Sequence, residues 1–480
     1  MKQRLQNQSG QLSLYILIFG AIAILILSGF IVWADLNIKS VIRQADQSLA
    51  LSIAEAGIEY YRWHLAHDPN DNQDGTAGPG PYEHEYFDKD GNLIGRFILD
   101  ITVPPLGSDV VIVRSTGKIE KDPEVEKIIQ ARMAVPSLAK YAVIANDDMR
   151  FGPGTEIFGQ VHSNQGIHFD GLAHNIIASA RGTYNDPDHS GNIEYSVHTH
   201  IDPIDPPPPT SLPERLDVFS AGRQLEVPAI DFDGLTASLA DIKTQAQNGD
   251  RYFADSGDEG YHLVLKTDDT FDLYRVTKIM KPPNGCVTVL GEQDWGTLTI
   301  ETEELIQNYP NPANGFIFVE DDLWIDGQIN SANLTIAAAR FPENPGQYRS
   351  IIINKDIFYT NYDGQDIISL ISQNNINVGL VSEDDLHIDA VLVAKNGRVG
   401  RFYYRPPLGG QQRCGPYHAR QKISIWGMLV TYTRYGFAFT DGTGYQNRVI
   451  GYDPNLIFSP PMGFPTAGGT HKIITWEEIK

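Results

Sequence analysis

The chain of 480 residues contains 41% hydrophobic residues, enough for two or three domains that each bury a core. Its 37 Lys and Arg side chains stand against 60 Asp and Glu side chains, so the formal net charge is −23. Nucleic-acid binding draws most of its affinity from basic residues that neutralise phosphates. The composition therefore excludes nucleic acid as a partner.

An uncharged apolar run extends from Leu12 to Trp33. It is long enough to cross the hydrocarbon core of a membrane as a helix, which takes about 20 residues. Lys2 and Arg4 precede the run, so the positive-inside rule places the first ten residues in the cytoplasm and the bulk of the chain outside. The run exceeds the apolar region of a signal peptide, although residues 32–34 resemble a cleavage site, so the sequence favours a permanent anchor in membrane lipid over a removable signal.

The helical pattern continues beyond the apolar run. About thirty residues without proline follow it, and apolar side chains recur there at spacings of three and four. We therefore predict one helix over residues 11–66, about 80 Å long, whose first half spans the membrane and whose second half is amphipathic. The apolar stripe, which we expect to pack against sister subunits, consists of Ile38, Ile42, Ala45, Leu49, Ile53 and Ala56.

The short basic leader, the glycine before the apolar run and the Ala-Glu-Ala-Gly sequence at 54–57 together resemble the type IV pilin-like proteins, most closely the PilX-type minor pilins. This resemblance implies that a prepilin peptidase removes a leader of residues 1–10 by cutting between Gly10 and Gln11. It also implies assembly with other pilin subunits by pilus or type II-like machinery. Major pilins carry a glutamate five residues into the mature chain, where this chain has Tyr15, so we expect a special, low-copy position in any filament.

Residues 67–136 have the texture of a small antiparallel sheet, which is the arrangement that follows the helix in pilins. Turn residues at 88–92 separate two apolar runs and predict a β-hairpin. The segments 110–117 and 127–135 predict two further strands.

An oxygen-rich loop at residues 68–75 lies between the predicted helix and hairpin. Asn70, Asn72 and Asp74 match part of the spacing of a calcium-binding loop, but Pro81 stands where the closing glutamate is required. We therefore interpret the loop as a solvated turn, with a calcium site as the alternative.

From about residue 137, short β-branched runs alternate with Gly, Asn and Asp. They predict a parallel β-solenoid-like domain formed by residues 137–202 and 284–440, with a β-sandwich as the alternative. The sequence Glu-Asp-Asp-Leu at 320–323 recurs 63 residues later at 383–386, which corresponds to three coils of about 21 residues.

Two further segments complete the predicted organisation, whose fold class is α+β to mainly β. Residues 203–283 start with a proline-rich connector and combine a helical pattern with a hairpin, so we predict an inserted α+β subdomain. Residues 441–480, rich in proline and aromatic rings, predict a C-terminal cap. Residues 155–480 resemble uncharacterised bacterial surface proteins that couple a PilX-type N-terminus to a repetitive β domain. This resemblance implies an architecture but no activity.

Motifs that carry chemistry are sparse: the sequence has no nucleophile elbow, Walker loop or zinc-protease motif. Six histidines lie between residues 162 and 200, and the spacing of His198 and His200 places both rings on one face of a strand. Zinc needs three or four converging ligands, and the spacing alone does not establish convergence. We therefore interpret these histidines as polar corner residues, with a metal site as the alternative.

Cys286 and Cys414 are the only cysteines, and both lie in the part predicted to be outside the cytoplasm, where a disulfide can form. Two buried free thiols are the alternative.

The paired acids at 321–322 and 384–385 are compatible with a glycan-active enzyme. However, acids at equivalent turns also protect sheet edges against unwanted strand pairing.

Together these patterns predict a non-enzymatic minor pilin-like or pseudopilin-like surface protein of the cell membrane. Its β-rich extracytoplasmic domain would serve pilus assembly or adhesion to an unknown surface ligand, and no cofactor is expected. The first alternative is a membrane-anchored structural or adhesive protein outside any filament. The second is a surface glycan-active β-solenoid enzyme.

Overall fold

The computed structural model describes residues 9–69, 71–103, 110–134, 138–189, 192–232, 239–292, 294–464 and 470–479. They form two compact units. A small unit combines the N-terminal 103 residues with residues 111–134 and the end of the chain, and a large unit contains the residues from 138 to 464. The predicted fold class is confirmed: one long N-terminal helix, a small antiparallel sheet and a large, mostly parallel β domain.

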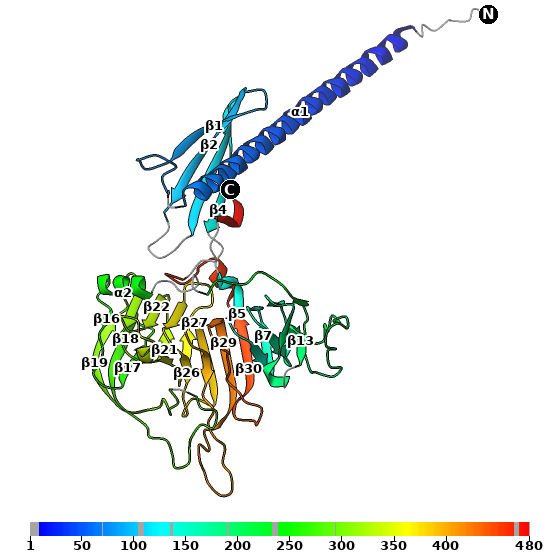
Figure 1. Cartoon of the computed structure of the whole chain (residues 1–480). Coiled ribbons are helices and arrows are strands. Elements are labelled where there is room, and N and C mark those ends of the chain that lie inside the picture. Colours follow the sequence, from blue (N-terminus) through cyan, green and yellow to red (C-terminus); the bar gives the residue numbers. More distant parts are fainter. Residues whose placement is uncertain are drawn as a thin grey trace, which may run out of the picture. The chain divides into compact units, whose positions relative to one another are not determined.

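The small unit begins with helix α1, Ser9–His67, whose 59 residues make it roughly 90 Å long (Figure 1). The predicted continuous helix is therefore confirmed over the described part of 11–66. Proline is absent up to Asp68, and Pro69 then disfavours the helical conformation of the residue before it. The backbone N–H of Asp68 makes the last helical hydrogen bond, to the carbonyl of His64 at 2.9 Å.

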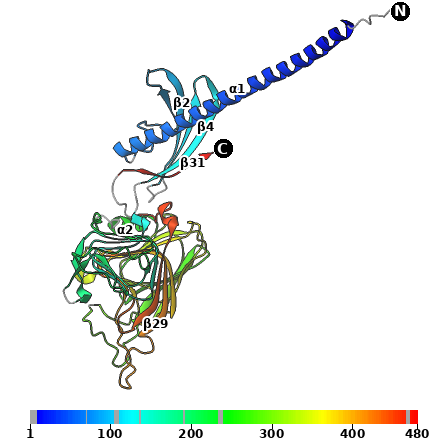
Figure 2. The ribbon, with the colours of Figure 1, turned by 90° about the vertical axis from the view of Figure 1, so that its right-hand side faces the viewer.

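A five-stranded antiparallel sheet in the order β1-β2-β3-β4-β31 covers the C-terminal half of α1 (Figure 2). The predicted hairpin is confirmed as β1–β2, and the two further strands as β3 and β4. The bounds are β1 Tyr82–Phe87, β2 Leu93–Thr102, β3 Val111–Ile119, β4 Asp122–Ala134 and β31 Lys472–Ile479.

The last strand corrects the predicted C-terminal cap over 441–480. Strand β31 pairs antiparallel with β4, with Trp476 opposite Ala131, and so completes the sheet of the small unit. Residues 444–452 are instead a strand of the large unit. The whole large unit lies between β4 and β31 in the chain, so no local pattern could reveal this pairing.

The described residues of the large unit form many strands and one α-helix. From the N-terminal side its strands are β5 Tyr141–Ala145, β6 Met149–Phe151, β7 Thr155–Phe158, β8 Gln160–Ser163, β9 Ile167–Phe169, β10 Leu172–Ala173, β11 Ile177–Ser179, β12 Thr183–Asn185, β13 Ile193–Tyr195, β14 Val197–His198 and β15 Arg223–Gln224. Helix α2, Leu239–Asn248, is followed by β16 Tyr252–Phe253, β17 Gly260–Leu265, β18 Thr270–Ile279, β19 Ile300–Pro310, β20 Phe316–Val319, β21 Leu323–Ile329, β22 Asn333–Ala338, β23 Ile351–Ile352 and β24 Ile357–Tyr359. The remainder are β25 Ile367–Ser372, β26 Ile376–Val378, β27 Asp385–Ala394, β28 Val399–Arg401, β29 Ala419–Thr431 and β30 Gly444–Tyr452, with 3₁₀ turns η1 Leu138–Lys140, η2 Pro187–His189, η3 Pro345–Gln347 and η4 Pro454–Ile457.

Successive strands of the large unit stack in parallel, but the coil length differs from the prediction. Gly327 pairs with Ile357, and Ile357 pairs with Ile388, so one coil here is half as long again as predicted. The repeated acidic segments are therefore two coils apart rather than three, although other coils are close to the predicted length, since Ser369 pairs with Val391 and Ile376 pairs with Val399. Turns of variable length between the short strands lengthen the coil, and the periodicity of the strands themselves does not record them.

The stacking order departs from chain order at the first strands of the large unit. Strand β5 pairs in parallel with β29, and β7 pairs with β30, so the first and last coils of the large unit are neighbours. Inside the stack Ile, Val, Leu and Ala side chains form a continuous core that includes Ile157, Ile325 and Leu392.

The predicted inserted subdomain over 203–283 is not separate from the stack. Strand β17 pairs in parallel with β21, and the predicted hairpin β17–β18 is confirmed as an extension of the same sheet. Helix α2 buries Leu239, Ile242 and Ala246 in a second core cluster of the large unit. The hairpin looks independent in the sequence because its parallel partner β21 follows only after β18, β19 and β20.

Candidate functional site

The N-terminal half of α1 is an apolar surface with no partner among the described residues. It contains an 18-residue window of mean hydropathy 2.7 of which no part is buried, so the helix is long and apolar enough to cross a membrane. Large side chains from Leu12 to Trp33 are exposed along it. The first charged side chains after this run are Asp35 and Lys39, which pair at 2.7 Å one helical turn apart.

The C-terminal half of α1 is instead packed against the sheet of the small unit. Ile53, Ile58, Tyr61 and Leu65 are fully buried or nearly so, in one core cluster with residues of β2, β3 and β4 such as Val113. A helix that is exposed and apolar over one half and docked over the other requires two different surroundings for its two halves.

The predicted stripe divides between these two surroundings. Ile38 and Ile42 are half exposed or more, and Ala45 is exposed as well. Leu49 and Ala56 lie at the edge of the packed region, and Ile53 is completely buried against the sheet. The six residues therefore do not form one free face, because the strands cover the last part of it.

The predicted processing position lies at the start of α1. Gly10 and Gln11 are helical, but their side chains fall outside the described part, as does the leader up to residue 8. Tyr15, where major pilins carry a glutamate, is 56% exposed within the apolar half.

Close approach of α1 to the sheet depends on glycine. A Cβ on Gly117 of β3 would lie 2.1 Å from the carbonyl oxygen of Ala50 and 2.4 Å from the backbone nitrogen of Ala54. On the helix, a Cβ on Gly57 would lie 2.3 Å from Ser115 Oγ. The small residues of the 54–57 segment therefore have a structural role, since they bring the backbone of α1 onto the strands.

One ion pair lies at the border of the packed region. The Asp46 carboxylate, almost buried, is 2.5 Å from the ammonium group of Lys121, which follows β3. The pair marks where the helix passes from its exposed half to its docked half.

The oxygen-rich loop after α1 is organised by Asp71, which the calcium pattern does not include. Its carboxylate accepts hydrogen bonds from the backbone N–H groups of Gln73 and Gly75 and from His64. These hydrogen bonds hold the pKa of Asp71 below its usual value against the opposing effect of desolvation. Asp74 is buried and faces His84 at 2.6 Å, Asn72 is half-buried, and Asn70 lies outside the described residues, so the calcium alternative stays a prediction.

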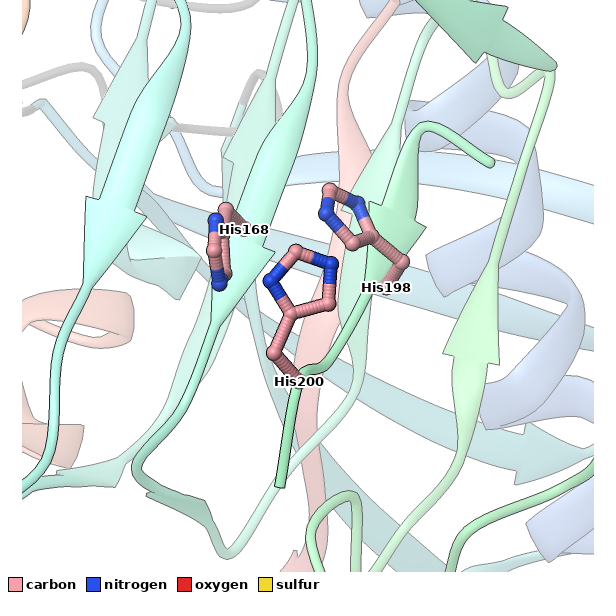
Figure 3. Close-up of side chains that lie close together, drawn as sticks. All are labelled: His168, His198 and His200. Atoms are coloured by element: carbon pink, nitrogen blue, oxygen red, sulfur yellow. The ribbon is translucent and has the colours of Figure 1, made fainter. Parts of the chain in front are cut away.

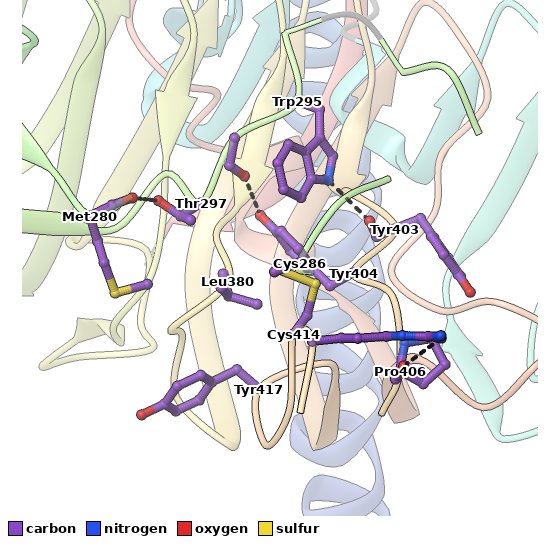
Figure 4. Close-up of a disulfide and its surroundings, with 12 residues drawn as sticks. Met280, Cys286, Trp295, Thr297, Leu380, Tyr403, Tyr404, Pro406, Cys414 and Tyr417 are labelled. Atoms are coloured by element: carbon purple, nitrogen blue, oxygen red, sulfur yellow. Dashed lines mark hydrogen bonds between the residues drawn. A yellow bond between two sulfur atoms is a disulfide. The ribbon is translucent and has the colours of Figure 1, made fainter. Parts of the chain in front are cut away.

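Cys286 and Cys414 form a disulfide, with a Cα–Cα distance of 4.5 Å (Figure 4). Leu380, Phe402 and Tyr404 surround it in a small core cluster. Of the two interpretations that the sequence left open, the structure has the disulfide.

The repeated acidic pairs serve as acceptors at turns. Asp321 is buried and accepts hydrogen bonds from the backbone N–H and the hydroxyl of Ser256. Burial raises the pKa of Asp322 to about 6, against the hydrogen bond from the backbone of Ser350. Asp385, at the position equivalent to Asp322 in the repeat, is exposed, so the two copies do not share an environment.

The six histidines between 162 and 200 separate into two groups. His162 contacts Asn164, and His174 pairs with Glu156 at 2.7 Å. The other four lie together with ring-centroid distances of 3.8 to 5.7 Å, which the interpretation as isolated corner residues did not anticipate. They are His168, His189, His198 and His200. The i, i+2 spacing of His198 and His200 was the only signal of this cluster in the sequence.

Comparison with known proteins gives little. No protein-family model matches the sequence, and no curated protein matches it. Among solved structures, the chain is similar to the crystal structure of the competence-associated pilin ComZ from Thermus thermophilus. The two share 12% identity over 90% of this chain and 98% of that chain, with a TM-score of 0.30, and a similarity at this level does not define a common fold.

Proposed function

We propose that this chain is a non-enzymatic, pilin-like surface protein that is anchored in the cell membrane by α1 and carries its β units outside the cytoplasm. The division of α1 supports this most directly: an uncharged, fully exposed apolar half continues without a break into a half that forms the core of a small antiparallel sheet. Exposed apolar surface of this extent is costly in water and favourable in lipid.

A removable signal sequence explains the same observation less well. A signal needs only the apolar segment, whereas here the helix that contains it also supplies Ile53, Ile58 and Tyr61 to a folded core. The disulfide adds independent support, because disulfides persist mainly in oxidising compartments outside the cytoplasm.

Assembly with other pilin-like helices forms part of the proposal. Ile38 and Ile42 lie beyond the apolar run, are exposed, and have the spacing of one helix face. We infer that this short face contacts a neighbouring helix, and that Tyr15, in place of a glutamate, restricts the protein to a special position in a filament.

Cross-linking in intact cells tests the assembly. Cysteine introduced at Ile42 should form cross-links to another pilin-like subunit, whereas cysteine at Gln44, about 200° around the same helix, should not. Peptide mass spectrometry of the mature chain should find Gln11 as the first residue. A protein that gives cross-links from neither position, and that leaves cells only with detergent and never with sheared filaments, is an anchor outside any filament.

The glycan-enzyme alternative has a separate test. Asp322→Asn removes the one acid of the repeated pairs whose pKa is raised into the range of a general acid. We expect no turnover of any polysaccharide in a panel by the original chain, and turnover that Asp322→Asn abolishes would replace the present proposal.

A further inference from the structure

The histidine cluster of the large unit is created by strand register. Strands β9 and β14 pair in parallel with His168 opposite His198, although strands β10 to β13 lie between them in the chain. Figure 3 shows these two rings with His200 beside them. The ring centroids of His198 and His200 are 4.9 Å apart, and His189, at the end of η2, places its ring 3.8 Å from that of His200.

The hydrogen bonding of His198 determines its tautomer. Its Nδ1 lies 3.0 Å from the carbonyl oxygen of Tyr195, and because a carbonyl only accepts, Nδ1 carries the proton. In the neutral ring Nε2 therefore presents a lone pair. This atom is buried, makes no hydrogen bond to any described residue, and lies 3.3 Å from Asp186 Oδ2. Two acceptors thus face each other in a buried site, an arrangement that a cation between them stabilises.

Asp186 is buried, and its carboxylate accepts hydrogen bonds from His168 Nδ1 and from the backbone N–H of Asp188. His168 donates from Nδ1 to Asp186 at 3.0 Å and from Nε2 to Asp170 at 2.8 Å. Because both ring nitrogens of His168 face carboxylate oxygens, this ring orients Asp186 and has no free nitrogen for a metal ion.

The remaining groups have the spacing of metal ligands. His198 Nε2 and His189 Nδ1 lie 3.3 and 3.7 Å from Asp186 Oδ2, and two ligands that are each about 2.0–2.1 Å from a tetrahedral zinc ion are roughly 3.4 Å apart. A nitrogen of His200 lies within 4.8 Å of a nitrogen of His189 and of one of His198.

We propose that Asp186, His189 and His198, whose ligand atoms all lie within 4.8 Å of one another, bind one divalent transition metal ion of the zinc class. Imidazole nitrogens with a single carboxylate suit zinc and disfavour calcium or magnesium, which take oxygen ligands. The Nδ1–H to carbonyl contact of His198 and the His168 contact to Asp186 would orient the ligands, as outer partners commonly do in metal sites. Asp186 and His189 come from the 3₁₀ turn η2 and the residue before it, and His198 comes from β14, so a bound ion ties η2 to the edge of β14.

Metal analysis of the full-length protein in detergent tests the proposal. After removal of metals with a chelator, the protein should take up one equivalent of Zn²⁺ and retain it through gel filtration. Co²⁺ in its place should give the intense visible absorption of tetrahedral coordination. His198→Ala should weaken zinc binding at least 100-fold. His174→Ala, which alters an exposed histidine paired with Glu156 outside the cluster, should leave the binding unchanged.

If His198→Ala does not fold, His189→Ala replaces it, because that side chain is about one-third exposed and its removal disturbs the core less. Uptake of no zinc by the full-length protein would overturn the proposal, as would equal uptake by the variant and the control. In either case the Asp186–His198 contact would be held by a proton on His198. The result does not bear on membrane anchoring, which depends on α1 in the other unit.

Discussion

At the residue scale, single positions decide how α1 is held. Gly117 allows the helix backbone to pass directly over β3, and any side chain there meets backbone atoms, which cannot rotate away as a side-chain tip can. At Gly78, a half-buried glycine in the loop before β1, a Cβ would meet no atom within 4 Å, and the backbone is not in a left-handed conformation. The two glycines therefore make a matched pair for substitution.

We expect Gly117→Ala to destabilise the docking of α1 by about 1–3 kcal/mol, the usual cost of overpacking a well-packed core. Hydrogen exchange of the amides of residues 50–65 measures this change. Gly78→Ala should alter it by less than about 0.5 kcal/mol, as surface substitutions do. Equal exchange in the two variants would contradict the close helix–sheet packing described above.

A second residue-scale prediction concerns His262 in β17. Its ring is buried between Glu303 at 2.7 Å and Asp326 at 2.8 Å. Burial opposes the charge, but hydrogen bonds to the two carboxylates raise the pKa of His262 above its ordinary value of 6.5. A raised pKa in the folded state means that the stabilisation is fully present below pH 6.5 and is lost as pH rises through the folded-state pKa.

We therefore expect His262→Gln to cost about 1.5–3 kcal/mol at pH 6, the range for hydrogen bonds to charged groups, and clearly less at pH 9.5. Protection of the β17 amides against hydrogen exchange, corrected for the intrinsic rate at each pH, measures the difference. A cost that is the same at both pH values would show that the ring is neutral in the folded protein.

At the element scale, the disulfide between Cys286 and Cys414 closes a loop with a sequence separation of 128 residues. Chain entropy alone then predicts a stabilisation of about 5 kcal/mol relative to the open chain. The double variant Cys286→Ser with Cys414→Ser should lose up to this amount in guanidinium denaturation. Alkylation of two free thiols in the original chain, purified without reductant, would contradict the pairing.

The elements also show what local sequence can and cannot predict. Helix α1 and the hairpins β1–β2 and β17–β18 are recognisable because their contacts are short in sequence. The stripe predicted to pack against sister subunits is not one free face of α1, since Ile53 is buried against the sheet while Ile38 is exposed. Which face a helix buries is decided by strands that arrive later in the chain, and the sequence of the helix does not contain that information.

At the scale of the whole molecule, long-range pairing accounts for the corrections. Strand β31 joins a sheet whose other strands end at residue 134, and β5 inserts beside β29. The histidine cluster has the same origin, because β9 and β14 bring His168 and His198 together by register. A single sequence reports the composition of such strands but does not specify which strands become neighbours.

The central claim is that the apolar half of α1 resides in a membrane, and alkaline carbonate extraction of cells that express the full chain tests it most directly. We predict that the original chain stays in the membrane pellet. Ile22→Lys combined with Leu25→Lys should move the chain to the supernatant, since each lysine costs about 2.5–3.5 kcal/mol at the centre of a membrane helix. Leu36→Lys, which alters an exposed leucine beyond the apolar run, should leave the chain in the pellet. Recovery of the original, full-length chain in the supernatant would contradict membrane anchoring by α1.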